Sequence, residues 1–74
     1  MGKKKIYMTR EDFLRRLRKL ARTANVDLVI DERGGAGSHY KVTYGDKQTT
    51  VPDGLKKGTF HGICKQLGIE PSDL

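Results

Sequence analysis

Apolar residues recur at helical spacing soon after the amino terminus. One side of the expected helix carries Phe13, Leu14, Leu17, Leu20, Ala21 and Ala24. Thr9 precedes this run and suits an N-cap, with Asp12 at the third helical position in a weak version of the capping box. We predict a helix that begins near Thr9 and ends at Asn25. At about 100° per residue, the opposite side carries Arg15, Arg18, Lys19 and Arg22.

An alternation of apolar and polar residues follows the helix. In VDLVIDER, Val26, Leu28 and Ile30 would share one face of a half-buried strand. The glycine-rich stretch RGGAGS, residues 33–38, is predicted to be a loop. HYKVTY and KQTTVP are predicted to be strands joined by Gly45-Asp46, a two-residue turn of type II′. The pattern therefore predicts three strands, joined as an antiparallel sheet.

The turn fixes the pairing of its two strands. Tyr44 would lie opposite Lys47, and Tyr40 would lie opposite Val51. The face expected to join the core carries Tyr40, Val42, Thr49 and Val51. The face expected to meet solvent carries His39, Lys41, Thr43, Gln48 and Thr50.

A second helical stripe, starting near residues 58–59, consists of Phe60, Ile63, Cys64 and Leu67. Gly68 suits a left-handed stop, on which Ile69 can fold back, and Pro71 prevents simple continuation. The order is helix, three strands, helix. With both helices on the apolar face of the sheet, the fold class is α+β, a two-layer sandwich. Residues 1–8 are expected to be a flexible basic leader, and residues 9–74 a single domain.

The net charge and the cysteine content of the chain favour some classes of function and exclude others. The chain has 74 residues, a net charge of +6 and a pI of about 9.7. A small basic domain most often meets a polyanion, and nucleic acid is the first candidate. Cys64 is the only cysteine, so the chain forms no internal disulfide and no clustered-cysteine metal site. Asp27, Asp31 and Asp53 lack metal-ligand spacing, so we expect no metal and no small-molecule cofactor. We also expect no membrane span and no signal peptide, and a cytoplasmic location.

His39 is the first candidate for chemistry. A histidine with an ordinary pKa of about 6.5 can give or take a proton at neutral pH. RNA can be cleaved by its own 2′-hydroxyl if a group removes that proton or protonates the leaving oxygen. Lys41, on the same strand face, could stabilise charge on the phosphate. The residues alone favour the plainer alternative, in which His39 is a solvent-facing strand residue. His61 is interpreted as a surface residue.

Three further features could hold phosphate. Gly34, Gly35 and Gly37 could let backbone N–H groups approach a phosphate, although such a loop is more often only a turn. Lys56 and Lys57 precede the second helix, whose N-terminus attracts anions. The stripe of Arg15, Arg18, Lys19 and Arg22 could follow a phosphate backbone. For the last two features, an ordinary solvated surface is an equally good explanation.

The order of several short motifs resembles the HicA family of toxins. The motifs are Gly37-Ser38-His39 before the second strand, Val51-Pro52 after the third, and KKGT with ICKQLGI in the second helix. The resemblance covers about residues 9–74. It implies a fold like that of a double-stranded-RNA-binding domain and metal-independent cleavage of mRNA by a histidine that follows Gly-Ser.

Carried over by position, the resemblance makes His39 the general acid or base. It adds Gly37 and Ser38 to the expected RNA contacts Lys41, Lys56, Lys57, Arg15, Arg18, Lys19 and Arg22. It also implies a HicB-type antitoxin that covers the active face. Two alternatives stay open at this point: a non-catalytic RNA-binding module of the same fold, and a domain that binds only proteins.

Overall fold

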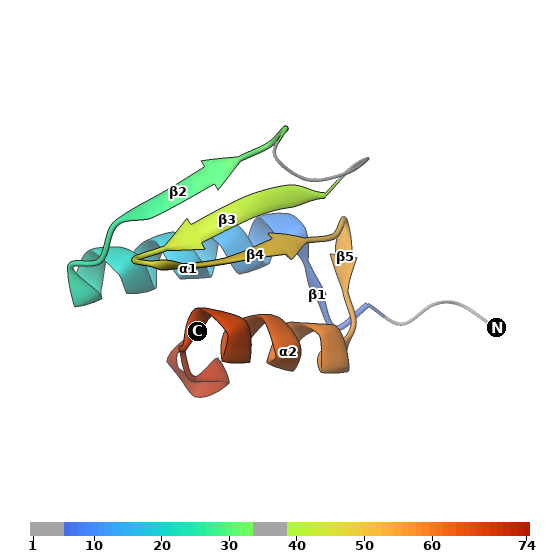
Figure 1. The fold of residues 1–74 in the computed structure, drawn as a ribbon. Helices are drawn as coiled ribbons and strands as arrows, with labels where there is room; N and C mark the ends of the chain where they lie inside the picture. Colours follow the sequence, from blue (N-terminus) through green and yellow to red (C-terminus); the bar gives the residue numbers. More distant parts are fainter. Residues whose placement is uncertain (1–5, 34–38) are drawn as a thin grey trace, which may run out of the picture.

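The computed structural model describes residues 6–33 and 39–74 (Figure 1). Two helices and a three-stranded antiparallel sheet form an α+β fold, to which a short two-stranded ladder is added. In chain order the elements are β1 (Met8–Thr9), α1 (Arg10–Ala24), β2 (Leu28–Asp31), β3 (Tyr40–Tyr44), β4 (Lys47–Val51), β5 (Gly54–Leu55), α2 (Lys57–Leu67) and the 3₁₀ helix η1 (Pro71–Asp73).

Helix α1 begins and ends as the sequence predicts. The Thr9 hydroxyl accepts a hydrogen bond from the Asp12 backbone N–H at 3.1 Å, which satisfies one of the free donors of the first turn. Asn25 closes the helix with φ of 59°, a left-handed conformation that asparagine tolerates. The predicted apolar face is buried except at its end. Leu20 is half-buried, and Ala24, the last residue of α1, is exposed.

The predicted sheet register is confirmed. Tyr44 pairs with Lys47 and Tyr40 with Val51, while β2 runs antiparallel to β3 with Leu28 opposite Tyr44. Gly45 has φ of 65°, and Asp46 keeps a negative φ, as a type II′ turn requires. Glycine is favoured at the first central position because a side chain there would be strained.

Helix α2 begins at Lys57, slightly earlier than expected, with Lys56 as its N-cap residue. Its predicted stripe of Phe60, Ile63, Cys64 and Leu67 is buried. Gly68, with φ of 71°, ends the helix, and the Ile69 N–H donates to the Cys64 carbonyl at 3.0 Å. This back-folding closes the last turn. The chain then continues into η1.

Both helices pack on one face of the sheet (Figure 1). Their buried side chains form a single cluster with Val42 of β3 and Val51 of β4. At its centre the rings of Phe13 and Phe60 meet edge to face, with 6.0 Å between centroids. The Thr49 hydroxyl donates to the Gln66 side-chain oxygen, which joins β4 to α2. The other sheet face, which carries Lys41, Gln48 and Thr50, is open to solvent.

The predicted element order omits the ladder of β1 and β5. Met8 lies opposite Leu55 and Thr9 opposite Gly54, and the Tyr7 N–H donates to the Leu55 carbonyl at 2.8 Å. Residues 7 and 8 of the expected leader thus pair with β5 through the backbone, and the division of the chain at residue 8 stays a prediction. Residues 1–5 of the expected leader lie outside the described residues. Strands of two residues are too short to show a period, so the pattern could not reveal them.

Candidate nucleic-acid interface

His39 stands exposed immediately before β3. Because side chains alternate along an extended chain, His39 and Lys41 share the open face of the sheet, while Tyr40 turns inward and is half-buried. The imidazole makes no hydrogen bond and no ion pair with the described part of the chain. Among the described residues, neither ring nitrogen has a partner that would compete with a ligand on this face.

Arg10 holds the strand residue next to His39. Its guanidinium carbon lies 3.7 Å from the centroid of the Tyr40 ring, and it forms an ion pair with Asp53 at 3.4 Å. The Arg10 side chain is buried, whereas that of Asp53 is 80 % exposed. A buried arginine over an aromatic ring combines packing with a cation–π interaction. Arg10 therefore packs against Tyr40, the residue that directly follows His39.

Sequence reasoning missed Arg10, although a signal was present. Arg10 lies four residues before Leu14 and seven before Leu17, so the helical period puts it on the apolar side of α1. A charged residue at such a position is either exposed at the end of the helix or paired within the fold. The structure shows the second arrangement.

Lys41 lies on the open face between two neighbours. It is opposite Thr50 on β4 and opposite Asp31 on β2. The Asp31 carboxylate accepts a hydrogen bond from the Arg33 backbone N–H at 2.9 Å. This turn ends β2 before the glycine-rich loop. Because side chains alternate along the strand, Lys41 lies on the same sheet face as His39 and supplies a positive charge there.

Gly34, Gly35, Gly37 and Ser38 lie outside the described residues. Their expected contacts with phosphate stay predictions.

Lys56 and Lys57 are exposed at the start of α2. Lys56 is the N-cap residue and Lys57 the first helical residue. Within the described part of the chain no side chain caps this helix end, and the first turn of α2 carries no acidic residue. The N–H groups of the first turn and two ammonium groups thus face the same end of the helix. The sequence prediction of a basic helix start is confirmed, and its role in RNA binding stays a prediction.

The basic stripe of α1, Arg15, Arg18, Lys19 and Arg22, lies on the other side of the molecule. All four side chains are exposed, and α1 turns its opposite side toward the core and the inner face of the sheet. Because His39 and Lys41 lie on the other face of the sheet, the helix and the sheet separate this stripe from them. The expected RNA contacts do not form one surface.

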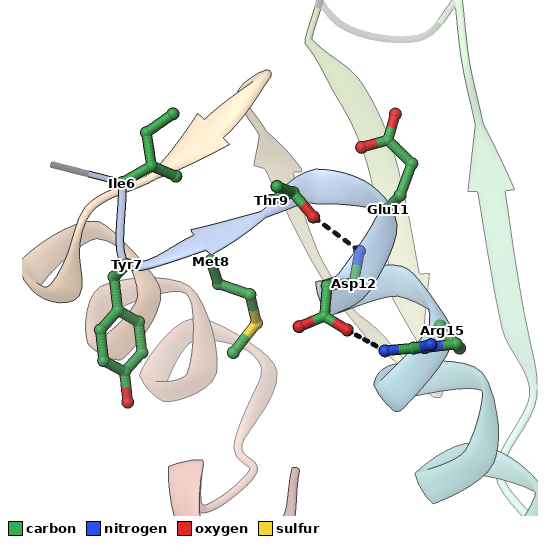
Figure 2. A pocket seen from close by; sticks show the side chains of 7 residues that line it. All are labelled: Ile6, Tyr7, Met8, Thr9, Glu11, Asp12 and Arg15. Atoms are coloured by element: carbon green, nitrogen blue, oxygen red, sulfur yellow. Dashed lines mark hydrogen bonds and ion pairs between the residues drawn. The ribbon is translucent and has the colours of Figure 1, made fainter. Parts of the chain in front are cut away.

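A cleft of about 570 Å³ lies where β1 enters α1 (Figure 2). Its lining combines exposed apolar side chains with two carboxylates and one arginine: Ile6, Tyr7, Met8, Thr9, Glu11, Asp12 and Arg15. Figure 2 shows Asp12 turned toward Arg15, with which it pairs, while Glu11 points away. Because its single cation is neutralised and a second carboxylate stands nearby, this cleft does not suit a phosphate backbone.

The two other side chains that could take part in a reaction, Cys64 and His61, lie outside this candidate site. Cys64 is fully buried, and burial raises the pKa of its thiol, so it is not a thiolate at neutral pH. His61 is exposed on α2, with its ring 5.5 Å from that of Phe60. Across residues 6–33 and 39–74, no group of three or more His, Cys, Asp or Glu side chains could hold a metal ion. In the same ranges, no helix has the length and apolar character needed to cross a membrane.

Comparisons of this chain with models of known protein families, with curated proteins and with solved structures found no significant match.

Proposed function

We propose that this chain is a metal-independent endoribonuclease of the toxin class that its resemblance to the HicA family implies. The observation that carries the proposal is the position of His39. It is exposed beside Lys41 on the open sheet face, with its imidazole free of partners in the described chain. Its strand neighbour Tyr40 is held by a buried arginine. A reactive group over an uncovered face suits a large substrate such as RNA.

The chemistry needs one proton to leave and one to arrive. The 2′-hydroxyl oxygen attacks the adjacent phosphorus and the bond to the 5′-oxygen breaks. In our proposal His39 acts as general acid or base in this step, by taking the 2′-hydroxyl proton or by protonating the leaving oxygen. Lys41 offsets the negative charge that builds on the phosphate oxygens. The second proton of the step is exchanged with solvent. The products are a 2′,3′-cyclic phosphate and a 5′-hydroxyl, and no water molecule is consumed in the first step.

The RNA would lie over the open face of the sheet. Gly37, Ser38 and Lys41 are the proposed contacts nearest to His39, and Lys56 and Lys57 are proposed contacts at the start of α2. An α+β fold with both helices on one sheet face supports the finer proposal of a fold like that of a double-stranded-RNA-binding domain. Contacts of this kind bind phosphate rather than base edges, so they would select RNA weakly by sequence.

The proposed partner is a HicB-type antitoxin, and the proposed location is the cytoplasm. The open face around His39 and Lys41 has no element of this chain over it in the described residues, and a net charge of +6 suits an acidic partner. Binding there would bury the imidazole and exclude RNA.

Induced expression of the wild-type chain should stop growth of a bacterial host and degrade its mRNA. Co-expression of the protein encoded beside this chain should restore growth, because it would cover His39. Growth curves and RNA gels would measure both effects, with an empty vector as control. Uninterrupted growth at a detectable level of folded protein would contradict the toxin proposal.

A non-catalytic RNA-binding module is the second candidate. One observation favours it: the basic stripe of α1 faces away from His39, so a phosphate backbone could bind there without reaching the imidazole. This candidate predicts RNA binding without cleavage.

A further inference from the structure

A groove of about 880 Å³ runs between α1 and the carboxyl-terminal end of the chain. Its α1 wall is almost entirely basic, and η1 and Leu74 form the other wall. The lining residues are Arg15, Arg16, Arg18, Lys19, Leu20, Arg22, Thr23, Asp73 and Leu74. The guanidinium of Arg16 donates to the Leu74 carbonyl oxygen at 3.2 Å, which joins the two walls.

The acidic residues of α1 neutralise only the first part of this wall. Glu11 and Asp12 lie in the first turn, and Asp12 pairs with both Arg15 and Arg16. Arg18, Lys19 and Arg22 make no ion pair and no hydrogen bond through their side chains with the described residues. Three neighbouring cations therefore line the groove without an ion-pair partner among the described residues, and Asp73 is the one acidic side chain in the lining.

The repulsion among these three cations destabilises α1. Arg18 and Arg22 are four residues apart, and Lys19 and Arg22 are three apart, so their charges repel along the same face of the helix. The core face of α1 requires none of these charges, because the burial of Phe13, Leu14 and Leu17 sets the packing. A ligand with several negative charges would relieve the repulsion.

We propose that the groove binds the phosphate backbone of RNA at a second site, separate from the site of cleavage. This inference rests on the proposed function for the choice of RNA as the polyanion. The spacing suits a strand rather than a single ion, since the unpaired cations Arg18 and Arg22 stand about 6 Å apart along the helix axis. With arginine and lysine as its donors, the groove binds charge and shape, not base sequence.

The position of the groove determines how RNA bound there affects cleavage at His39. It lies on the side of α1 that faces away from the sheet, so an RNA segment in it does not touch His39. A long RNA can occupy both faces at once, and the second contact raises the local concentration of the strand at His39. The groove therefore increases affinity for long RNA and leaves the chemical step unchanged.

The test compares two double variants of equal charge. Arg18→Gln with Arg22→Gln removes two groove cations, and Lys47→Gln with Lys65→Gln removes two exposed lysines elsewhere. Both lower the net charge from +6 to +4, since each loses two positive charges. Glutamine keeps the helix propensity of α1. Circular dichroism confirms the fold of each variant.

Affinity is measured on a His39→Ala background, with a fluorescent single-stranded RNA of about 30 nucleotides. The groove variant should bind this RNA about 5–20-fold more weakly than its parent, and its salt slope should fall by about 1.4. The matched variant should change affinity by about threefold or less. In the wild-type background, cleavage of a trinucleotide should have the same kcat/KM with and without the groove substitutions, because so short a strand cannot span both faces.

Equal weakening by both double variants would overturn the inference, since it would report net charge alone. Unchanged binding by the groove variant would also overturn it, as would binding to phosphatidylserine vesicles in place of RNA. A fall in trinucleotide cleavage would join the groove to the catalytic site and contradict its separation. If the wild type cleaves no RNA but the groove variant still loses affinity, the proposed enzyme fails and the groove stands.

Discussion

Replacing His39 with alanine should reduce RNA cleavage by roughly 10²–10⁴-fold, the usual contribution of one general acid or base. The imidazole is exposed and has no partner in the described chain, so its loss should change the free energy of unfolding by about 0.5 kcal/mol or less. RNA binding should fall only slightly, because the lysines and arginines supply most of it. Cleavage rates, circular dichroism and RNA affinity measure the three quantities separately.

The chain offers a matched control in its other histidine. His61 is also exposed, but it lies on α2. His61→Ala should therefore cleave RNA at nearly the wild-type rate. A folded His39→Ala variant with full activity would rule out the catalytic role and favour the RNA-binding module. A variant that fails to fold would make His39 structural.

Replacing Phe13 with alanine should remove about 3–5 kcal/mol of stability. Phe13 is fully buried, and its ring meets Phe60 edge to face where α1 and α2 join. A chain of this length is stabilised by roughly 4–11 kcal/mol in total, so the variant should lose about a quarter or more of its stability, and at the low end of that range it should be largely unfolded. Urea unfolding followed by circular dichroism measures the loss, since the chain has no tryptophan.

Two other variants test whether the loss of stability comes from the buried volume of the Phe13 side chain. Phe13→Leu keeps most of the buried volume and should lose less stability than Phe13→Ala. Val29→Ala truncates an apolar side chain that is 58 % exposed, and should change stability by about 0.5 kcal/mol or less. A loss below about 1 kcal/mol in Phe13→Ala would contradict the placement of Phe13 at the centre of the core.

The main elements of the fold could be predicted because each leaves a repeated signal. Phe13, Leu14 and Leu17 mark the buried side of α1, and Gly45 fixes the turn that aligns β3 with β4. The ladder of β1 and β5 could not be predicted, since two residues show no period. Its pairing depends on the chain path after Pro52, which brings Leu55 back to Met8.

The candidate site was predictable in sequence position but not in arrangement. Alternation placed His39 and Lys41 on the open face, and the structure agrees. The α1 stripe was included among the expected RNA contacts because of its charge, which does not tell how far it lies from His39. Arg10 was missed although its position on the apolar side of α1 gave a signal. Its partners Tyr40 and Asp53 come from distant parts of the chain, so the helical period could not identify them.

The most direct measurement is the cleavage of a defined RNA by the purified wild-type chain in excess EDTA, with analysis of the new ends. We expect sustained cleavage, a 2′,3′-cyclic phosphate and a 5′-hydroxyl. A matched RNA with a single 2′-deoxyribose at the cut position should resist cutting there, because the attacking oxygen is missing. Cleavage that stops in EDTA and returns with added metal, or that continues at the deoxy position, would contradict the proposed chemistry.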